Sequence, residues 1–505
     1  MLLIHPPVAK PCEPPAGIAR LAGVLRGRDI ACDLLDANLE GLLYLLAAPH
    51  KPTDTWSRRA CRNLAANLAA LRAPQLYTNQ ARYQRAVVDV NRVLEQAGRQ
   101  YRLTLSFANY QDGGRSPLTS GDLLKAAERP ADTVFYRYFA HRLPALLDEK
   151  QPAMIGLSLN YLSQALCTFA MIGFLQANYP GLPVVLGGGL VTSWLRNPAW
   201  RDPFAGLVDH LVAGPGEGPL LSLLGGPRKS ATNLQNQTPD YSDLPLADYL
   251  APGFILPYAA SSGCYWNKCS FCPEKAEENP YLGLKTDRVL DDIGLLVERT
   301  RPVLLHFLDN AISPALLRAL ADWPPGVPWY SFARVSPLLT DVDFCRTLHR
   351  SGCVMLKLGL ESGDQGVLDA MHKGIDLGMV SRALAALHEA GIATYVYLLF
   401  GTPAESRAAA GRTLEFVARH SRAITFLNLA VFNMPVCSPE ARTLAVRDFY
   451  EGDLSLYTDF THPHEWDRKT VRRYLDQEFK RHPAVSKILR RDPPLFTSNH
   501  APFFC

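Results

Sequence analysis

Apolar runs alternate with helix-like stretches through the first part of the chain. Leu2–His5 and Ile30–Leu35 are short and apolar like buried strands, and Pro14–Arg26 between them repeats its apolar residues at helical spacing. Further on, Ala153–Leu159 is apolar again and precedes a helical pattern that extends to about Asn178. Strands that alternate with helices predict parallel pairing, because parallel strands need a crossover connection.

Two later apolar runs, 183–186 and 208–212, end in glycines: Gly187, Gly188, Gly189, Gly214, Gly216 and Gly218. Strands that end in glycine turns are typical of a doubly wound, Rossmann-like sheet, in which a ligand lies at the carboxyl ends of the strands. We therefore predict a Rossmann-like domain over residues 1–225. Residues 41–147 interrupt it with Ala, Leu and Arg at helical spacing and a polar loop at 109–120, so we predict a helical insertion there.

A polar stretch, 226–250, predicts a linker, and beyond it the alternation resumes over 251–440. Six apolar runs there are separated by helical patterns: 254–260, 303–308, 329–335, 354–360, 393–400 and 424–432. Six consecutive strand–helix units predict a partial (β/α)6 barrel of the TIM type, with its chemistry at the carboxyl ends of the strands. The fold class is thus α/β. Residues 441–505 read as a helical, basic extension with an irregular aromatic end.

Charge and hydropathy exclude several classes of protein. The 52 Lys and Arg residues nearly balance the 48 Asp and Glu residues, which argues against a nucleic-acid partner. The most apolar long window, 154–175, is interrupted by Asn160, Ser163 and Gln164, so we expect no membrane segment. We also expect no signal peptide at the amino terminus. The 11 cysteines are odd in number and mostly scattered, which favours a reducing, cytoplasmic location over a disulfide framework.

Three cysteines gather directly after the first barrel strand, in the run Cys264-Tyr-Trp-Asn-Lys-Cys269-Ser-Phe-Cys272. No second Cys-x-x-Cys pair completes a four-thiolate zinc site. Three soft ligands suit an iron–sulfur cluster with one iron left open. A zinc site completed by a distant histidine, or three unrelated buried cysteines, remain the alternatives.

These cysteines resemble the motif of the radical S-adenosylmethionine (SAM) superfamily, although the usual spacing is C-x3-C-x2-C and this chain has one residue more. Other residues carry the same resemblance in the same order: Phe271, Asp309-Asn310, Arg334, Gly359-Leu-Glu361-Ser362-Gly363, Lys373-Gly374 and Leu399-Phe-Gly401-Thr-Pro403-Ala-Glu405. The resemblance implies a 4Fe–4S cluster on Cys264, Cys269 and Cys272. It also implies S-adenosylmethionine contacts from Phe271, Asp309, Asn310, Arg334, Glu361, Ser362 and Gly401.

The first domain is similar to the cobalamin-binding (B12) domain that precedes the barrel in one branch of this superfamily. The similarity implies corrinoid contacts from Pro15, Ser158, Gly187, Gly188, Gly189, Gly214, Gly216 and Glu217. No Asp-x-His-x-x-Gly motif supplies a histidine for cobalt, and Leu190 follows the glycine run. Such an absence fits members of the branch that lack the lower histidine, and it equally fits a domain that has lost its corrinoid.

The resemblance implies a cobalamin-dependent radical SAM enzyme, and a methyltransferase acting on an unactivated carbon is the leading hypothesis. It implies a small-molecule or peptide substrate and an electron donor such as flavodoxin or ferredoxin. Three alternatives stay open: a rearrangement or cyclisation, a radical enzyme without cobalamin, and a cobalamin- or cluster-based sensor. We expect the insertion and the extension to shape the substrate site, and we take His462-Pro-His464-Glu465 as a polar surface loop.

Overall fold

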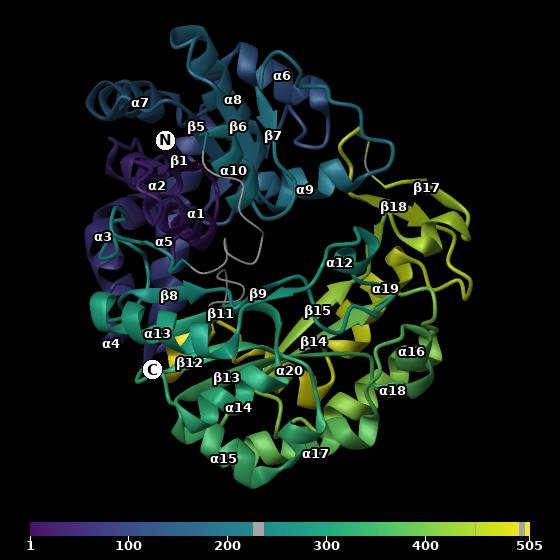
Figure 1. Ribbon diagram of the computed structural model, residues 1–505. Helices are drawn as coiled ribbons and strands as arrows, with labels where there is room; N and C mark the ends of the chain where they lie inside the picture. Colours follow the sequence, from purple (N-terminus) through teal and green to yellow (C-terminus); the bar gives the residue numbers. More distant parts are fainter. Residues whose placement is uncertain (226–236, 450, 494–499) are drawn as a thin grey trace. The chain divides into compact units, whose positions relative to one another are not determined.

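The computed structural model describes residues 1–225, 237–449, 451–493 and 500–505 of the chain (Figure 1). The chain divides into two compact units, which are described separately below. Unit 1 is Met1–Phe254 with Tyr450–Leu456, and unit 2 is Ile255–Phe449 with Tyr457–Cys505. The first part of the predicted linker, 226–236, lies outside the described residues. Its described end, from 237 onward, belongs to unit 1, where Asp240 N–H donates to Ala19 O at 2.9 Å.

Unit 1 contains a five-stranded parallel sheet in the order β2-β1-β5-β6-β7. The strands are β1 (Leu2–His5), β2 (Asp33–Asp36), β5 (Ile155–Ser158), β6 (Val184–Gly187) and β7 (His210–Leu211). The helices that follow them include α1 (Ala16–Arg26), α8 (Leu162–Asn178), α9 (Gly189–Arg196) and α10 (Glu217–Leu223). This is the predicted Rossmann-like sheet. The central strands are almost fully buried, which explains why they read as unbroken apolar runs.

The insertion between β2 and β5 is helical with one hairpin. Its helices are α2 (Ala37–Ala47), α3 (Thr55–Leu71), α4 (Pro74–Tyr77), α5 (Gln80–Arg99), α6 (Ser120–Glu128) and α7 (Tyr136–Lys150). The polar loop predicted from residue 109 instead begins as β4 (Asn109–Asp112), which pairs antiparallel with β3 (Leu103–Ser106). In this hairpin Leu103, Leu105 and Tyr110 are buried, and the polar residues between them face solvent. Three apolar side chains are too few to show the two-residue hydrophobic period of a strand in the sequence.

Unit 2 contains a six-stranded parallel sheet whose strands follow the chain in order, as a partial barrel requires. The strands are β8 (Ile255–Tyr258), β11 (Leu304–Ile312), β12 (Trp329–Ala333), β13 (Cys353–Glu361), β14 (Ala393–Phe400) and β15 (Phe426–Val431). The connecting helices include α13 (Thr286–Thr300), α14 (Pro314–Asp322), α15 (Val342–Arg350), α16 (Gln365–Ala370), α17 (Leu377–Glu389) and α18 (Arg407–Arg419). The α/β class and both sheets agree with the sequence-based prediction.

Strands precede the helices of the carboxyl-terminal extension, where the sequence suggested a helical stretch followed by an irregular aromatic end. Strands β16 (Met434–Pro435), β17 (Val446–Asp448) and β18 (Tyr457–Phe460) form a small antiparallel sheet. Helices α19 (Arg468–Tyr474) and α20 (Pro483–Leu489) follow. The strands are only two to four residues long and mostly polar, so no apolar alternation marked them.

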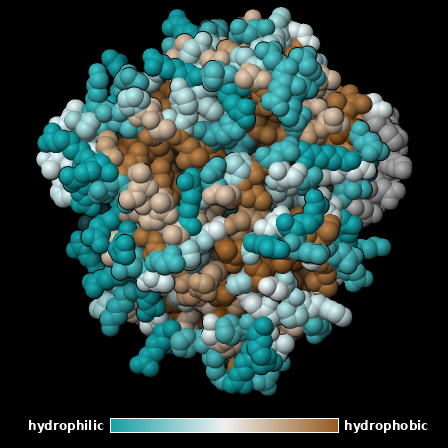
Figure 2. All heavy atoms as spheres, turned by 90° about the vertical axis from the view of Figure 1, so that its left-hand side faces the viewer, coloured by the Kyte–Doolittle hydropathy of each residue, from teal (hydrophilic) through white to brown (hydrophobic). Residues whose placement is uncertain are grey.

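On the face that Figure 2 presents, hydrophobic side chains form several patches between hydrophilic ones. Over the described part of the chain, no helix combines the length and the hydropathy of a membrane span.

Candidate functional site

The three motif cysteines lie on a loop that begins at the carboxyl end of the first barrel strand. Strand β9 (Ser261–Ser262) precedes the loop and pairs antiparallel with β10 (Leu282–Gly283). Gly263 has a φ of 72° there, and a Cβ at this residue would overlap the carbonyl of Pro280. Asn267 inside the loop has a φ of 43°, which asparagine tolerates better than most residues. The loop is thus a defined turn above the barrel.

Cys264, Cys269 and Cys272 are each half-buried. Burial raises the pKa of the Cys269 thiol, and the nearby cations of Lys373 and Arg334 oppose that rise. Burial also raises the pKa of the Cys272 thiol, to about 11. Thiolates of this kind become ligands when a metal centre replaces their protons, so the donor set fits an iron–sulfur cluster. Within the described ranges, no three His, Cys, Asp or Glu side chains are arranged to hold a single metal ion.

Phe271, between the last two cysteines, packs against the carboxyl ends of the last barrel strands. Its ring contacts an apolar cluster formed by Phe432, Met434 and Phe460. The ammonium group of Lys373 lies 5.5 Å from the centre of its ring. Phe271, predicted to contact S-adenosylmethionine, therefore lies between the cysteine loop and the extension.

Asp309 and Asn310, at the end of β11, have different surroundings. Asp309 is 2% exposed, and its carboxylate accepts hydrogen bonds from Ala260 N–H at 3.0 Å and from the Ser261 hydroxyl. Burial raises the pKa of this carboxyl, and those hydrogen bonds oppose the rise. Asn310 is exposed and donates to Gly263 O at 3.3 Å. Asp309 thus fixes the start of the cysteine loop, while Asn310 alone faces solvent.

Glu361 and Ser362 stand at the end of β13, as the motif predicts. Glu361 accepts an ion-paired hydrogen bond from Lys373 Nζ at 2.8 Å, and both side chains are about nine-tenths buried. Its φ of 67° turns the chain away from the strand. Ser362 is fully buried and its hydroxyl lies 3.2 Å from Thr413 Oγ1. Ser362 therefore anchors the turn to α18, and the Glu361–Lys373 pair remains beside the cysteines.

The turn after β14 carries a buried carboxyl. Gly401 has a φ of 79°, and its N–H donates to Glu405 Oε2 at 2.6 Å. Trp466 of the extension donates its indole N–H to the same oxygen at 2.8 Å. Burial raises the pKa of Glu405 to about 7, with both hydrogen bonds opposing the rise. Nothing in the sequence indicated that Trp466 contacts this turn, because Trp466 and Glu405 are 61 residues apart in the chain.

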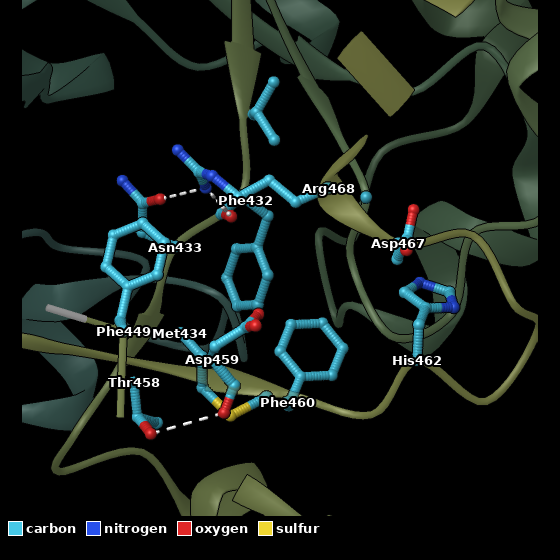
Figure 3. A pocket seen from close by; sticks show the side chains of 12 residues that line it. Phe432, Asn433, Met434, Phe449, Thr458, Asp459, Phe460, His462, Asp467 and Arg468 are labelled. Atoms are coloured by element: carbon cyan, nitrogen blue, oxygen red, sulfur yellow. Dashed lines mark hydrogen bonds between the residues drawn. The ribbon is translucent and has the colours of Figure 1, made fainter. Parts of the chain in front are cut away.

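A small pocket lies where the last two barrel strands meet the extension (Figure 3). It encloses about 20 Å³, roughly the room of one water molecule. Arg468 donates to Phe432 O at 3.0 Å and to the Asn433 side chain, and its guanidinium lies 4.7 Å from the Phe449 ring centre. His462 also lines the pocket; it is 7% exposed and its Nε2 lies 2.9 Å from Thr402 O. The interpretation of His462 as a surface residue is therefore wrong.

Lysine and histidine also face the barrel interior, which sequence reasoning missed. Lys357 of β13 is 2% exposed, and its Nζ lies 3.3 Å from His306 Nε2. The rings of Tyr330 and Phe332 lie 4.7 and 4.9 Å from the same ammonium group. Interiors of TIM-type barrels are usually filled by branched apolar residues, so this aromatic and basic interior is unusual. The strand alternation could have indicated it, because Lys357 interrupts an apolar run.

In unit 1, the predicted corrinoid-contacting residues share one edge of the sheet. Ser158 ends β5 and Gly187 ends β6. Pro15, Gly188 and Gly216 precede the first residues of α1, α9 and α10, respectively. Helix starts and glycines at the carboxyl edge of a parallel sheet present backbone N–H groups to a ligand.

The glycines at this edge serve different purposes. Gly188 has a φ of 112°, and a Cβ there would overlap the backbone of Leu159. Gly189 N–H donates to the side chain of Asn160 at 3.0 Å. Gly214 has a φ of 69°, and a Cβ there would meet nothing within 4 Å. The fold itself requires glycine at position 188. At position 214, a side chain would point into open space and would not clash with the protein.

Glu217 and the position after the glycine run complete this edge. Glu217 is 6% exposed and pairs with Arg20 at 2.5 Å, so its carboxylate joins α10 to α1. Leu190 is the second residue of α9, directly after Gly189, and is buried at 3% exposure. The residues present therefore fit a large flat ligand bound against backbone, with no imidazole offered from this loop.

Comparisons with known proteins agree with this architecture. Residues 258–417 match the Radical SAM superfamily. The fold is similar to that of the radical SAM methyltransferase TsrM from Kitasatospora setae, with cobalamin and a 4Fe–4S cluster bound. The TM-score is 0.51 at 15% identity, over 88% of this chain and 77% of TsrM. It is also similar to the cobalamin-dependent S-adenosylmethionine radical enzyme OxsB, with a TM-score of 0.59 at 12% identity, over 94% of this chain and 66% of OxsB.

Two curated relatives match about a third of the chain. Bacteriochlorophyllide d C-12(1)-methyltransferase from Chlorobaculum tepidum is 27% identical over 176 residues, 33% of this chain and 38% of the relative. An uncharacterized methyltransferase from Pyrococcus horikoshii is 24% identical over 191 residues, 36% of this chain and 40% of the relative. The alignments thus span about two fifths of each relative. The chain thus contains a domain, residues 258–417, that matches the radical SAM superfamily, and its fold is similar to those of the cobalamin-binding radical SAM enzymes TsrM and OxsB.

Proposed function

We propose that the chain is a cobalamin-dependent radical SAM enzyme that methylates an unactivated carbon of a small-molecule or peptide substrate. The observation that carries this proposal is the placement of Cys264, Cys269 and Cys272 on one loop at the mouth of the radical SAM barrel, in a chain whose first unit has the Rossmann-like fold. Both curated relatives are named as methyltransferases, which favours methyl transfer over the other reactions of radical enzymes.

The side chains of unit 2 would hold and orient the cofactors. Cys264, Cys269 and Cys272 would bind three irons of a 4Fe–4S cluster, and the fourth iron would be left to S-adenosylmethionine. Bound together, these groups supply one-electron chemistry that no amino-acid side chain offers. The Glu361–Lys373 pair and Asn310 would face the amino-acid and ribose parts of S-adenosylmethionine, and Phe271 would limit the space for its adenine.

In unit 1, the sheet edge that carries Ser158, Gly187 and Gly214 would support cobalamin. The glycines of this edge let a wide macrocycle approach the backbone closely, because they have no Cβ. The cluster would receive its electrons from a flavodoxin or a ferredoxin, since clusters of this type need a low-potential donor. All 11 cysteines are free, which supports a reducing, cytoplasmic location.

The test is the metal content of the full chain after anaerobic purification from cells supplied with cobalamin. We expect about four irons and one cobalt per chain, with the absorbance of both groups. Incubation with S-adenosylmethionine and a strong reductant should then release 5′-deoxyadenosine. Four irons without cobalt would replace the proposal with a cobalamin-free radical enzyme. Zinc in place of iron, or no S-adenosylmethionine cleavage, would overturn it in favour of a zinc protein or a sensor.

A further inference from the structure

Trp266 joins the cysteine loop to the barrel. This residue is the second of four between Cys264 and Cys269, where the superfamily usually has three. The guanidinium carbon of Arg334, just beyond β12, lies 3.7 Å from the centre of the indole ring, and Lys268 Nζ lies 4.8 Å from it. The indole N–H donates to His372 O at 3.2 Å. The side chain therefore reaches from the loop to two other parts of the barrel mouth.

Arg334 fixes the other side of this contact. One of its terminal nitrogens donates to Gly374 O at 2.7 Å and also to Lys373 O. Gly374 has a φ of 64°, and a Cβ there would overlap the Trp266 ring and come within 3.0 Å of Arg334. The guanidinium is thus held between an aromatic ring and two backbone carbonyls. We call Trp266, Arg334 and Gly374 the clamp.

The clamp acts on one cysteine in particular. Cys264 follows the β9–β10 ribbon, and Cys272 precedes helix α12 (Pro273–Ala276), whose Ala276 N–H donates to Cys272 O at 3.0 Å. Cys269 has neither support. It lies between Trp266 and Ser270, and Ser270 N–H donates to Met371 O at 3.0 Å, next to the carbonyl that Trp266 binds. Both anchors around Cys269 thus reach the same backbone segment, 371–374.

We propose that Trp266 and Arg334 are positioning residues that fix Cys269 for cluster binding, and that Arg334 acts on the cysteine loop and not on S-adenosylmethionine. The additional residue in the C-x4-C spacing gives the loop the length to place an indole between the cysteines and the barrel. Arginine suits this position because its flat guanidinium can stack on the ring and bind carbonyls in its own plane at once. This inference rests on the proposed cluster, which the first experiment measures separately.

The experiment measures how fast reconstituted full-length protein loses iron to a ferrous chelator under anaerobic conditions. We expect Trp266→Ala and Arg334→Leu each to release iron about tenfold faster than the wild type, the range expected for losing a partly desolvated cation–π contact. The double variant should release iron more slowly than the product of the two single effects predicts, because the stacking contact that both residues share is lost only once. Trp266→Phe keeps a ring for stacking and should lie between the wild type and Trp266→Ala.

Two further measurements separate positioning from general destabilisation. The electron paramagnetic resonance signal of the reduced cluster should broaden in Trp266→Ala and Arg334→Leu, while their unfolding midpoints stay close to that of the wild type. Matched controls are Trp323→Ala and Arg318→Leu, two exposed residues of the same unit, which should change neither iron release nor the signal.

Affinity for S-adenosylmethionine, measured on samples of equal iron content, decides the role of Arg334. We expect an unchanged Kd for Arg334→Leu. A wild type that binds no iron would refute the proposed function. A wild type that binds iron, with variants that release it at the wild-type rate, would overturn the clamp alone. Loss of S-adenosylmethionine binding in Arg334→Leu, with normal iron release, would show that Arg334 contacts S-adenosylmethionine and does not position the cysteine loop.

Discussion

The cysteine loop of unit 2 and the glycine-bearing sheet edge of unit 1 are built in opposite ways. In the loop, each candidate group is a side chain with its own support: Cys269 lies between the contacts of Trp266 and Ser270, and Glu361 is paired with Lys373. At the sheet edge, most of the candidate residues are glycines, which offer backbone and no side chain. There Gly188 lies against Leu159, while Gly214 borders open space.

This difference decides what a substitution can reveal. Removing a thiol or a carboxylate deletes one chemical group, and the remaining contacts still hold the fold. A loss of cofactor binding in such a variant therefore shows that the group belongs to the site. Adding a methyl group to a glycine can lower the stability of the fold or weaken ligand binding. Comparing two glycines with similar backbone strain separates these two effects. The four predictions that follow use this contrast, starting with the largest effect.

The largest effect is expected at the cysteine loop. Cys269→Ala should lower the iron content from about four per chain to background, because a three-ligand cluster does not survive the loss of one thiolate. Cys61→Ala, at a half-buried cysteine in α3, is the matched control and should keep all its iron. Iron and acid-labile sulfide assays on the reconstituted chain give the answer. Full iron content in Cys269→Ala would show that this cysteine is not a ligand.

At the sheet edge, Gly188→Ala should damage the fold itself. The residue has a φ of 112° and a Cβ would overlap the Leu159 backbone, so we expect unit 1 to lose about 3 kcal/mol or more of unfolding free energy. Gly189→Ala is the control, because a Cβ there meets nothing closer than 3.8 Å. Denaturant unfolding of both variants tests this. Equal midpoints would mean that the glycine run serves the ligand alone.

The buried carboxyl of Glu405 should make the free energy of unfolding of unit 2 depend on pH. Burial raises the folded-state pKa of Glu405 to about 7 from 4.5, so the folded state holds its proton more tightly than the unfolded state. The tighter proton binding stabilises the folded state by roughly 3 kcal/mol. This stabilisation is complete below pH 4.5 and is lost as the pH rises through about 7. Glu405→Gln should remove this slope and keep an acceptor for Gly401 and Trp466. Identical pH profiles of the unfolding midpoint for the two proteins would contradict the buried ionisation.

The smallest effect should come from Gly214→Ala. Its φ of 69° makes alanine cost about 1 kcal/mol in stability, and the added methyl group would point into open space where cobalamin is proposed. Gly206→Ala is closely matched, with a φ of 85° and nothing within 4 Å of a Cβ. We expect equal losses of stability, and about tenfold weaker cobalamin binding for Gly214→Ala only, by equilibrium titration. Equal cobalamin affinities would remove Gly214 from the corrinoid site.

Much of the fold was predictable because its strands are buried. The strand predicted at 393–400 coincides with β14, and the other barrel strands differ from the prediction by a few residues at their ends. Strands buried on both faces consist of continuous apolar runs, and such runs are visible without any contact information. The short strands β4, β17 and β18 were not predicted, since each has only three or four residues and is held by backbone pairing and not by an apolar pattern of its own.

The candidate site was predictable in its residue types but not in their partners. The motifs indicated Asp309 and Arg334 equally as cofactor contacts. In the structure Asp309 accepts hydrogen bonds from Ala260 and Ser261, and Arg334 stacks on Trp266. Nothing in a linear motif distinguishes a carboxylate that binds a ligand from one that ties a loop. That distinction depends on which backbone N–H groups the folded chain brings within reach.

By itself the sequence determined two parallel sheets, their order along the chain and a three-cysteine loop after the first barrel strand, because hydrophobic period and cysteine spacing are local properties. Only the tertiary structure decided that Trp266 meets Arg334, that Glu405 is buried under Trp466, and that Gly188 and Gly214 differ in purpose. Each of these depends on distances between residues far apart in the chain. Packing sets such distances, and the same motif can be packed in more than one way.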